Sequence, residues 1–190
     1  PTASVGDCGT TLPTYAWSFT GGIPATSISA DPGAISYNTP GTYTINLTVT
    51  NECGTTTATP ITVTIKPTPI IDDIPNQEKC KGELSNATSF TEILPGTVFN
   101  WINSNTAIGL AASGTGNINP FTLSNTGTTV LTATIIVTPT LNGCTGTPKT
   151  FTIKVNPLPT IPIVSPISYC QNATAIPLAP TVLANHTLNW

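Results

Sequence analysis

Apolar and polar residues alternate along several stretches of this chain. Within residues 41–50 the alternate positions are apolar and the intervening ones are mostly Thr or Asn; the apolar residues are Tyr43, Ile45, Leu47 and Val49. A period of two places successive side chains on opposite faces of a strand. The pattern predicts a half-buried antiparallel strand, which a turn at residues 51–54 connects to a second alternating strand at residues 61–65.

The same plan returns in the second half of the chain. Residues 131–137 alternate, residues 142–144 form a predicted turn, and residues 151–155 alternate again. Upstream of these strands, Trp17 and Trp101 each lie within a further predicted strand. Because both aromatic residues keep a fixed place in the repeat, we expect them to fill a core between two sheets. A surface platform that stacks on sugars is the alternative.

Short sequence markers recur about 90 residues apart. Lys66-Pro67-Thr68-Pro69, Cys80 and Asn100-Trp101 return with offsets of 90, 90 and 89 residues as Asn156-Pro157-Leu158-Pro159, Cys170 and Asn189-Trp190. A fixed period of this size indicates a string of separately folding modules rather than one large core. The alternating prolines between modules restrict the backbone and predict short, extended linkers.

The expected fold class is all-β, with tandem immunoglobulin-like sandwich modules. We predict module boundaries at residues 1–67, 68–157 and 158–190, the last being the truncated start of a third module. The chain is expected to be an excerpt from a longer protein, because Trp101 still has a whole module downstream of it whereas the equivalent Trp190 is the final residue.

Charge and composition exclude several classes of function. Charged residues make up 7% of the chain, the net charge is −3 and there is no arginine, so a phosphate backbone would find few partners and nucleic-acid binding is not expected. Asn, Thr, Gly and Pro interrupt each apolar run before it reaches the roughly 20 residues of a membrane-spanning helix. We therefore predict no membrane span in this segment.

Five well-separated cysteines predict structural disulfides and an oxidising, extracytoplasmic location. We expect Cys8 to pair with Cys53 in the first module and Cys80 to pair with Cys144 in the second. Cys170 occupies the place of Cys80 in the next repeat, so its partner is expected beyond Trp190. A thiolate metal site is not expected, because no cysteines have CxxC spacing and the chain has one histidine.

Candidate catalytic and metal-binding residues are sparse. His186 has no recognisable nucleophile motif near it, and we expect a solvent-exposed histidine and no enzyme activity or cofactor. Asp72 and Asp73 lie near the junction of two modules, where they either hold a calcium ion or belong to a solvated loop. Calcium requires six or more oxygen ligands and several carboxylates, so the solvated loop is favoured.

Two parts of the chain resemble known repeats. Residues 15–22 (YAWSFTGG) and 37–51 (YNTPGTYTINLTVTN) resemble a PKD domain, a β-sandwich named after polycystic kidney disease. The family usually has acidic residues after the tryptophan, where Ser18 and Thr20 stand here. The second module carries Cys80-Lys81-Gly82, Phe99-Asn100-Trp101 and residues 151–155, and it resembles divergent PKD-like repeats. The opening of the third, residues 169–173, is similar to bacterial immunoglobulin-like repeats.

Together these likenesses are to the repeats of giant gliding-motility adhesins, the SprB-like surface proteins of bacteria. The resemblance implies a non-enzymatic, extracellular segment of a cell-surface filament that serves attachment and gliding. It also implies export by type IX secretion, and contact with neighbouring repeats, the gliding machinery and a surface polysaccharide or other substratum. The alternative is an accessory or carbohydrate-binding module of a secreted multidomain hydrolase, because PKD-type units also occur there.

Overall fold

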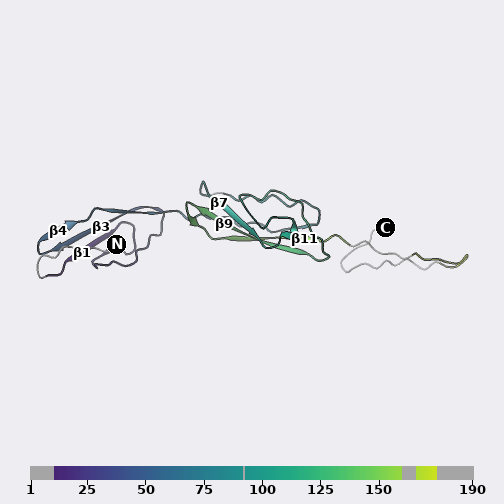
Figure 1. Cartoon of the computed structure of the whole chain (residues 1–190), viewed down its shortest axis with the longest axis horizontal. Coiled ribbons are helices and arrows are strands. Elements are labelled where there is room, and N and C mark those ends of the chain that lie inside the picture. The colour runs from purple at the N-terminus through teal and green to yellow at the C-terminus, as the bar shows by residue number, and fades with distance from the viewer. Residues whose placement is uncertain (1–10, 92, 160–165, 175–190) are drawn as a thin grey trace. The chain divides into compact units, whose positions relative to one another are not determined.

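A computed structural model describes residues 11–91, 93–159 and 166–174 of the 190-residue chain (Figure 1). Almost all of its regular structure is β-strand, which confirms the predicted all-β fold class. Contacts divide the chain into two compact units, residues 1–69 with 140–145 and residues 70–139 with 146–190. By its hydrogen bonds, however, the hairpin at residues 140–145 belongs to the sheet of the second unit.

The first unit contains one five-stranded antiparallel sheet with β3 at its centre. Its strand order is β2-β1-β3-β4, and β5 also pairs with β3. The strands are β1 (Thr14–Phe19), β2 (Thr26–Ser27), β3 (Gly41–Asn51), β4 (Gly54–Thr57) and β5 (Ile61–Ile65). The alternation seen in the sequence is thus a true strand pattern, since β3 and β5 occupy the two stretches that it predicted.

The two faces of this sheet differ as the alternation requires. The apolar face carries the buried cluster of Trp17, Phe19, Ile45, Leu47 and Val49. On the other face, threonine hydroxyls pair across the strands, with oxygen–oxygen distances of 3.3 Å between Thr48 and Thr57 and 2.9 Å between Thr50 and Thr55. Threonine suits such a face because its β-branch favours extended backbone while its hydroxyl stays hydrated.

The second unit is built on a six-stranded sheet of order β6-β11-β9-β7-β8, with β10 also paired to β9. The strands are β6 (Gln77–Cys80), β7 (Val98–Asn103), β8 (Ser113–Thr115), β9 (Leu131–Leu141), β10 (Cys144–Thr145) and β11 (Lys149–Asn156). A second layer is less regular and holds the isolated antiparallel bridges Leu84↔Thr122 and Thr88↔Ile118. A short 3-10 helix, η1 (Thr106–Ile108), follows β7.

The core of the second unit is larger than that of the first. The inward side chains of β9 and β11 are almost completely buried, and the cluster includes Phe99, Trp101, Ile108, Leu123, Ala133, Ile135, Val137, Phe151, Ile153 and Val155. Trp101 packs against Gly114 of β8, where an added Cβ would collide with the indole ring. A residue without a side chain is therefore required opposite this tryptophan.

The described part of the chain contains no helix that is long and apolar enough to span a membrane.

Candidate functional site

The first and last strands of the second unit lie side by side and run in the same direction. β6 pairs in parallel with β11, from Gln77 opposite Ile153 to Cys80 opposite Asn156. The ladder continues at its end, where the backbone N–H of Lys81 donates to the carbonyl of Asn156 at 2.9 Å. Because these two strands adjoin the two ends of the unit, tension on the chain would load their hydrogen bonds in shear.

Side chains extend this contact before the ladder begins. The Asn76 Oδ1 atom accepts a hydrogen bond from the backbone N–H of Thr152 at 2.7 Å, and Lys149 Nζ lies 2.6 Å from Asp73 Oδ1. The contact therefore runs from residue 73 to residue 81 on one side and from residue 149 to residue 156 on the other. We call this contact the terminal-strand clamp.

A buried asparagine supports the opposite end of the clamp, near Val155, from the core side. Asn125 is fully buried, and its Nδ2 atom donates to the carbonyls of Val155 at 2.8 Å and Thr129 at 2.9 Å. Its Oδ1 atom accepts from the N–H of Gly127 at 3.0 Å. The bonds to Thr129 and Gly127 lie within the loop before β9, and the bond to Val155 joins that loop to β11, so the buried amide is satisfied.

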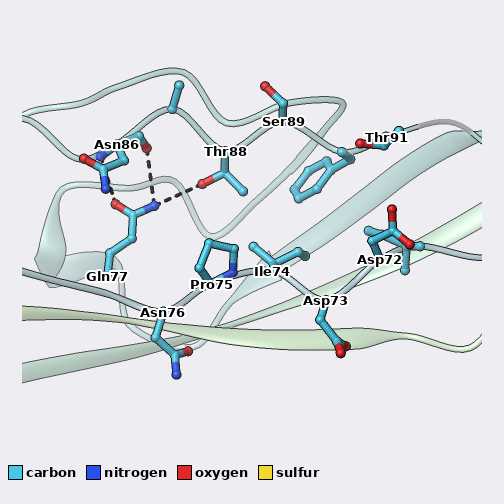
Figure 2. Close-up of a pocket in the computed structure, with 13 residues that line it drawn as sticks. Asp72, Asp73, Ile74, Pro75, Asn76, Gln77, Asn86, Thr88, Ser89 and Thr91 are labelled. Carbon is cyan, nitrogen blue, oxygen red and sulfur yellow. Dashed lines mark hydrogen bonds between the residues drawn. The ribbon is translucent and has the colours of Figure 1, made fainter.

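Next to the clamp, a groove of about 370 Å³ lies between residues 71–77 and residues 86–91 (Figure 2). Gln77 closes one end of it. Its Oε1 atom accepts from the N–H of Asn86 at 2.9 Å, and its Nε2 atom donates to the Asn86 carbonyl at 3.3 Å and to Thr88 Oγ1 at 3.1 Å. Because Gln77 is 7% exposed, this bonding satisfies a buried amide and fixes the width of the groove.

The sequence favours a solvated loop over a calcium site for Asp72 and Asp73, and the two side chains separate at this groove. Asp73 forms an exposed ion pair with Lys149, whereas Asp72 points toward the open end of the groove (Figure 2). Within the described residues, no three His, Cys, Asp or Glu side chains gather as metal ligands. The Asp73 carboxylate therefore pairs with a lysine of β11, and the Asp72 carboxylate is exposed to solvent.

The ion pair predicts an acid-dependent loss of stability. The hydrogen bond and then the charge of Lys149 lower the pKa of Asp73 from its ordinary value of 3.8. A lowered pKa stabilises the folded state above the unfolded-state pKa, and this stabilisation disappears as the pH falls through the folded-state value. The melting temperature of the second unit should exceed that of Asp73→Asn above about pH 5, and the gap should close as the pH falls through and below the ordinary value of 3.8. A gap that stays constant through the acid range would contradict the pairing.

The predicted bridge between Cys80 and Cys144 is wrong, because both thiols are free. Cys80 lies opposite Asn156, at the end of the sheet where Val155 pairs with Leu131. Cys144 instead pairs with Leu141, at the other end of β9. Ten residue steps of about 3.4 Å separate those ends by roughly 34 Å, whereas a disulfide needs Cα atoms about 4.4–6.8 Å apart.

The structure describes only some of the other cysteines for which we made predictions. Cys53 is disulfide-bonded, but Cys8 lies outside the described residues, so the pairing of the two stays a prediction. Cys170 is an exposed free thiol. His186 and Trp190, with most of the predicted third module, also lie outside the described residues.

Thiol labelling tests directly whether Cys80 and Cys144 are unpaired. Cys80 is exposed, so iodoacetamide should label it without prior reduction, and Cys80→Ser should change the free energy of unfolding by no more than about 0.5 kcal/mol. Losing a structural disulfide would instead cost about 2–5 kcal/mol. Peptide mapping under non-reducing conditions is the measurement. A cross-linked peptide containing Cys80 and Cys144 would contradict the structure.

Both predicted core tryptophans are inside their units. Trp17 is 4% exposed and stacks on Phe19 with ring centroids 5.8 Å apart, and Trp101 is 7% exposed. Their indole N–H groups donate to the carbonyls of Ser29 at 2.9 Å and Gly116 at 3.2 Å. Because neither ring offers a face to solvent, neither can stack on a sugar.

Comparison with protein families accounts for these two sheets. A model of the PKD domain matches residues 2–67, and a model of the PKD-like domain matches residues 77–159. The chain carries two PKD-type domains. The PKD-type resemblance predicted from the sequence is therefore confirmed, and the strands β1, β3 and β5 in one domain and β6 to β11 in the other lie within the matched ranges. No curated protein matches the chain.

Several residues that shape the second PKD-type domain were not predicted. Gln77, Asn76 and Thr88 stand in stretches without regular alternation, so no periodic signal marks them. Asn76 bonds Thr152, 76 residues away, and Gln77 bonds Asn86 and Thr88, 9 and 11 residues away across an irregular segment. Asn125 is different, because Ser-Asn-Thr-Gly at residues 124–127 is a turn sequence in which Asn commonly bonds the backbone two residues ahead. That bond was predictable; its bond to Val155 was not.

Proposed function

We propose that this chain is a non-catalytic spacer segment of an extracellular surface adhesin, which extends the protein and transmits tension between its ends. The observation that carries the proposal is the terminal-strand clamp. A parallel pair formed by the first and last strands shares an applied load among all its bonds at once, whereas an antiparallel hairpin at the same place would open one bond at a time. The PKD-type domains support an extracellular repeat.

The domain cores and the linker sequence are consistent with this role. Each of the two domains has its own buried apolar core, so each can transmit a load as a folded unit. Short linkers such as Lys66-Pro67-Thr68-Pro69 limit how much slack the chain holds between domains. Attachment and gliding motility, with export by type IX secretion, are the cellular setting that we propose for the parent protein.

A domain replacement in the parent protein tests the spacer role. Deleting residues 77–159 should weaken attachment of the cells to glass, because the filament becomes shorter and loses one stiff element. Replacing the same residues with an unrelated folded domain of similar length should restore attachment. If the replacement fails while the protein still reaches the cell surface, as shown by antibody labelling of intact cells, the segment has a specific function that a spacer does not have.

The groove beside the clamp favours one further candidate, a carbohydrate-binding accessory module of a secreted hydrolase. A parent chain with one adjacent catalytic domain would support it, whereas many further repeats would support the adhesin.

A further inference from the structure

The groove between residues 71–77 and 86–91 has the form of a small-ligand site. Its volume of about 370 Å³ lies near the lower end of the range of about 300–1,000 Å³ that is usual for such sites. The apolar side chains of Ile74 and Pro75 lie along its middle, and polar groups stand at its two ends (Figure 2). Phe90 is a further apolar residue of its lining. The combination of an apolar floor with a few polar groups is typical of a site that orients a compact ligand.

The hydrogen bonds at the Gln77 end of the groove show which donors remain free for a ligand. Both Nε2 protons of Gln77 are used, one by the Asn86 carbonyl and one by Thr88 Oγ1. Thr88 therefore accepts a bond from Gln77, and its own hydroxyl proton remains available as a donor. Thr88 lines the groove and is 6% exposed, so this end can donate one hydrogen bond to a ligand oxygen that reaches the buried hydroxyl.

The open end offers the opposite chemistry. Asp72 is exposed, and its carboxylate has no bonding partner among the residues that the structure describes. The nearby cation Lys149 is already engaged by Asp73 at 2.6 Å. A ligand thus meets an acceptor with negative charge at this end, and the groove lacks a free cation among its lining residues.

These features select among ligand classes. An anion would face the Asp72 carboxylate without a balancing cation, and a large ligand exceeds the volume. A hydroxyl group can donate to Asp72 and can also accept from Thr88, and a pyranose ring carries hydroxyls at its rim and C–H groups on its face. We infer that the groove binds one neutral sugar residue of a glycan, with its C–H face on Ile74 and Pro75.

This site is separate from the tryptophans for which sugar stacking was considered. It also does not depend on the mechanical role proposed above, because sugar binding is measured without force. Loss of the clamp and loss of sugar binding are therefore distinguishable, and either proposal can fail without the other.

The test is an NMR titration of the full chain with glucose, galactose, mannose and N-acetylglucosamine, and with their linked trimers. At least one should shift the backbone signals of residues 71–77 and 86–91, with a dissociation constant on the order of 1 mM. Asp72→Asn removes a charged acceptor and should weaken binding by about tenfold to a hundredfold. Because Asp72 is exposed, the variant should keep the melting temperature of the wild type.

Asp31→Asn is the matched control, since Asp31 is also exposed but does not line the groove. It should bind sugar as the wild type does. The inference is overturned if none of these sugars shifts the groove signals, if the shifts fall elsewhere, or if Asp72→Asn binds equally well. Larger groove shifts with free lysine, glucuronate or a lysine-containing peptide would also overturn it, because they would show a charged or peptide ligand.

Discussion

Trp101→Ala should lower the free energy of unfolding of the second PKD-type domain by about 3–5 kcal/mol. The indole is 7% exposed and belongs to the larger of the two apolar clusters among the described residues, so its removal leaves a cavity that β8 and β9 cannot close without moving. For a domain of this size each kcal/mol shifts the melting temperature by about 4–8 °C, and the expected drop is therefore on the order of 20 °C.

Overpacking the same contact with Gly114→Ala should destabilise the domain by about 1–3 kcal/mol, because the new methyl group collides with the ring of Trp101. Differential scanning calorimetry of the full chain measures both effects. Trp17→Ala is the matched control, since Trp17 belongs to the core of the first domain. Trp17→Ala should lower the midpoint temperature of a different unfolding transition, that of the first domain. If Trp101→Ala and Trp17→Ala lower one common transition together, the two domains do not unfold separately.

The second large effect is expected at the clamp, from Lys79→Pro. The N–H of Lys81 donates to Asn156, and alternate peptide groups of a strand face the same neighbour, so the N–H of Lys79 also points toward β11. Proline removes this donor and leaves a carbonyl of β11 without its partner, at a cost of about 1–3 kcal/mol. The force needed to unfold the second domain should fall accordingly.

Glu78→Pro provides the matched control one residue away. Its N–H lies on the other side of β6, as does that of Cys80, which donates to the Glu83 side chain. Proline is tolerated where a strand faces away from its neighbour. Because Glu78 Oε1 also accepts a hydrogen bond from Asn156 Nδ2 at 3.2 Å, Glu78→Ala is measured beside it. Relative to Glu78→Ala, Glu78→Pro should keep most of the unfolding force. Equal losses for the two variants would show that the parallel ladder does not resist the load.

Much of the fold followed from sequence because its signals are local. The alternating residues of β3 and β9 show which face of each strand is buried, and the fixed positions of Trp17 and Trp101 mark the core. These features depend on neighbours one to four residues apart. The less regular second layer of the second domain, which contains the Thr88↔Ile118 bridge, has no such alternation and was not predicted in detail.

The clamp and the cysteine pairing depend on contacts that sequence patterns do not encode. A parallel pair such as β6 with β11 joins residues 76 positions apart, and nothing near Gln77 reveals its partner. The wide spacing of the cysteines along the chain predicts structural disulfides, and a bridge between Cys80 and Cys144 was expected on that basis. The direction of β6 places these thiols at opposite ends of the sheet, and pairing requires proximity in space rather than order along the chain.

Pulling the full chain from both ends in a force spectrometer tests the central claim most directly. The account predicts two separate unfolding events. One of them releases on the order of 250 Å of chain, for the residues between Gln77 and Asn156. This event should occur at lower force in Lys79→Pro than in the wild type or in Glu78→Pro. A single event that extends the whole chain, or an unchanged force in Lys79→Pro, would contradict it.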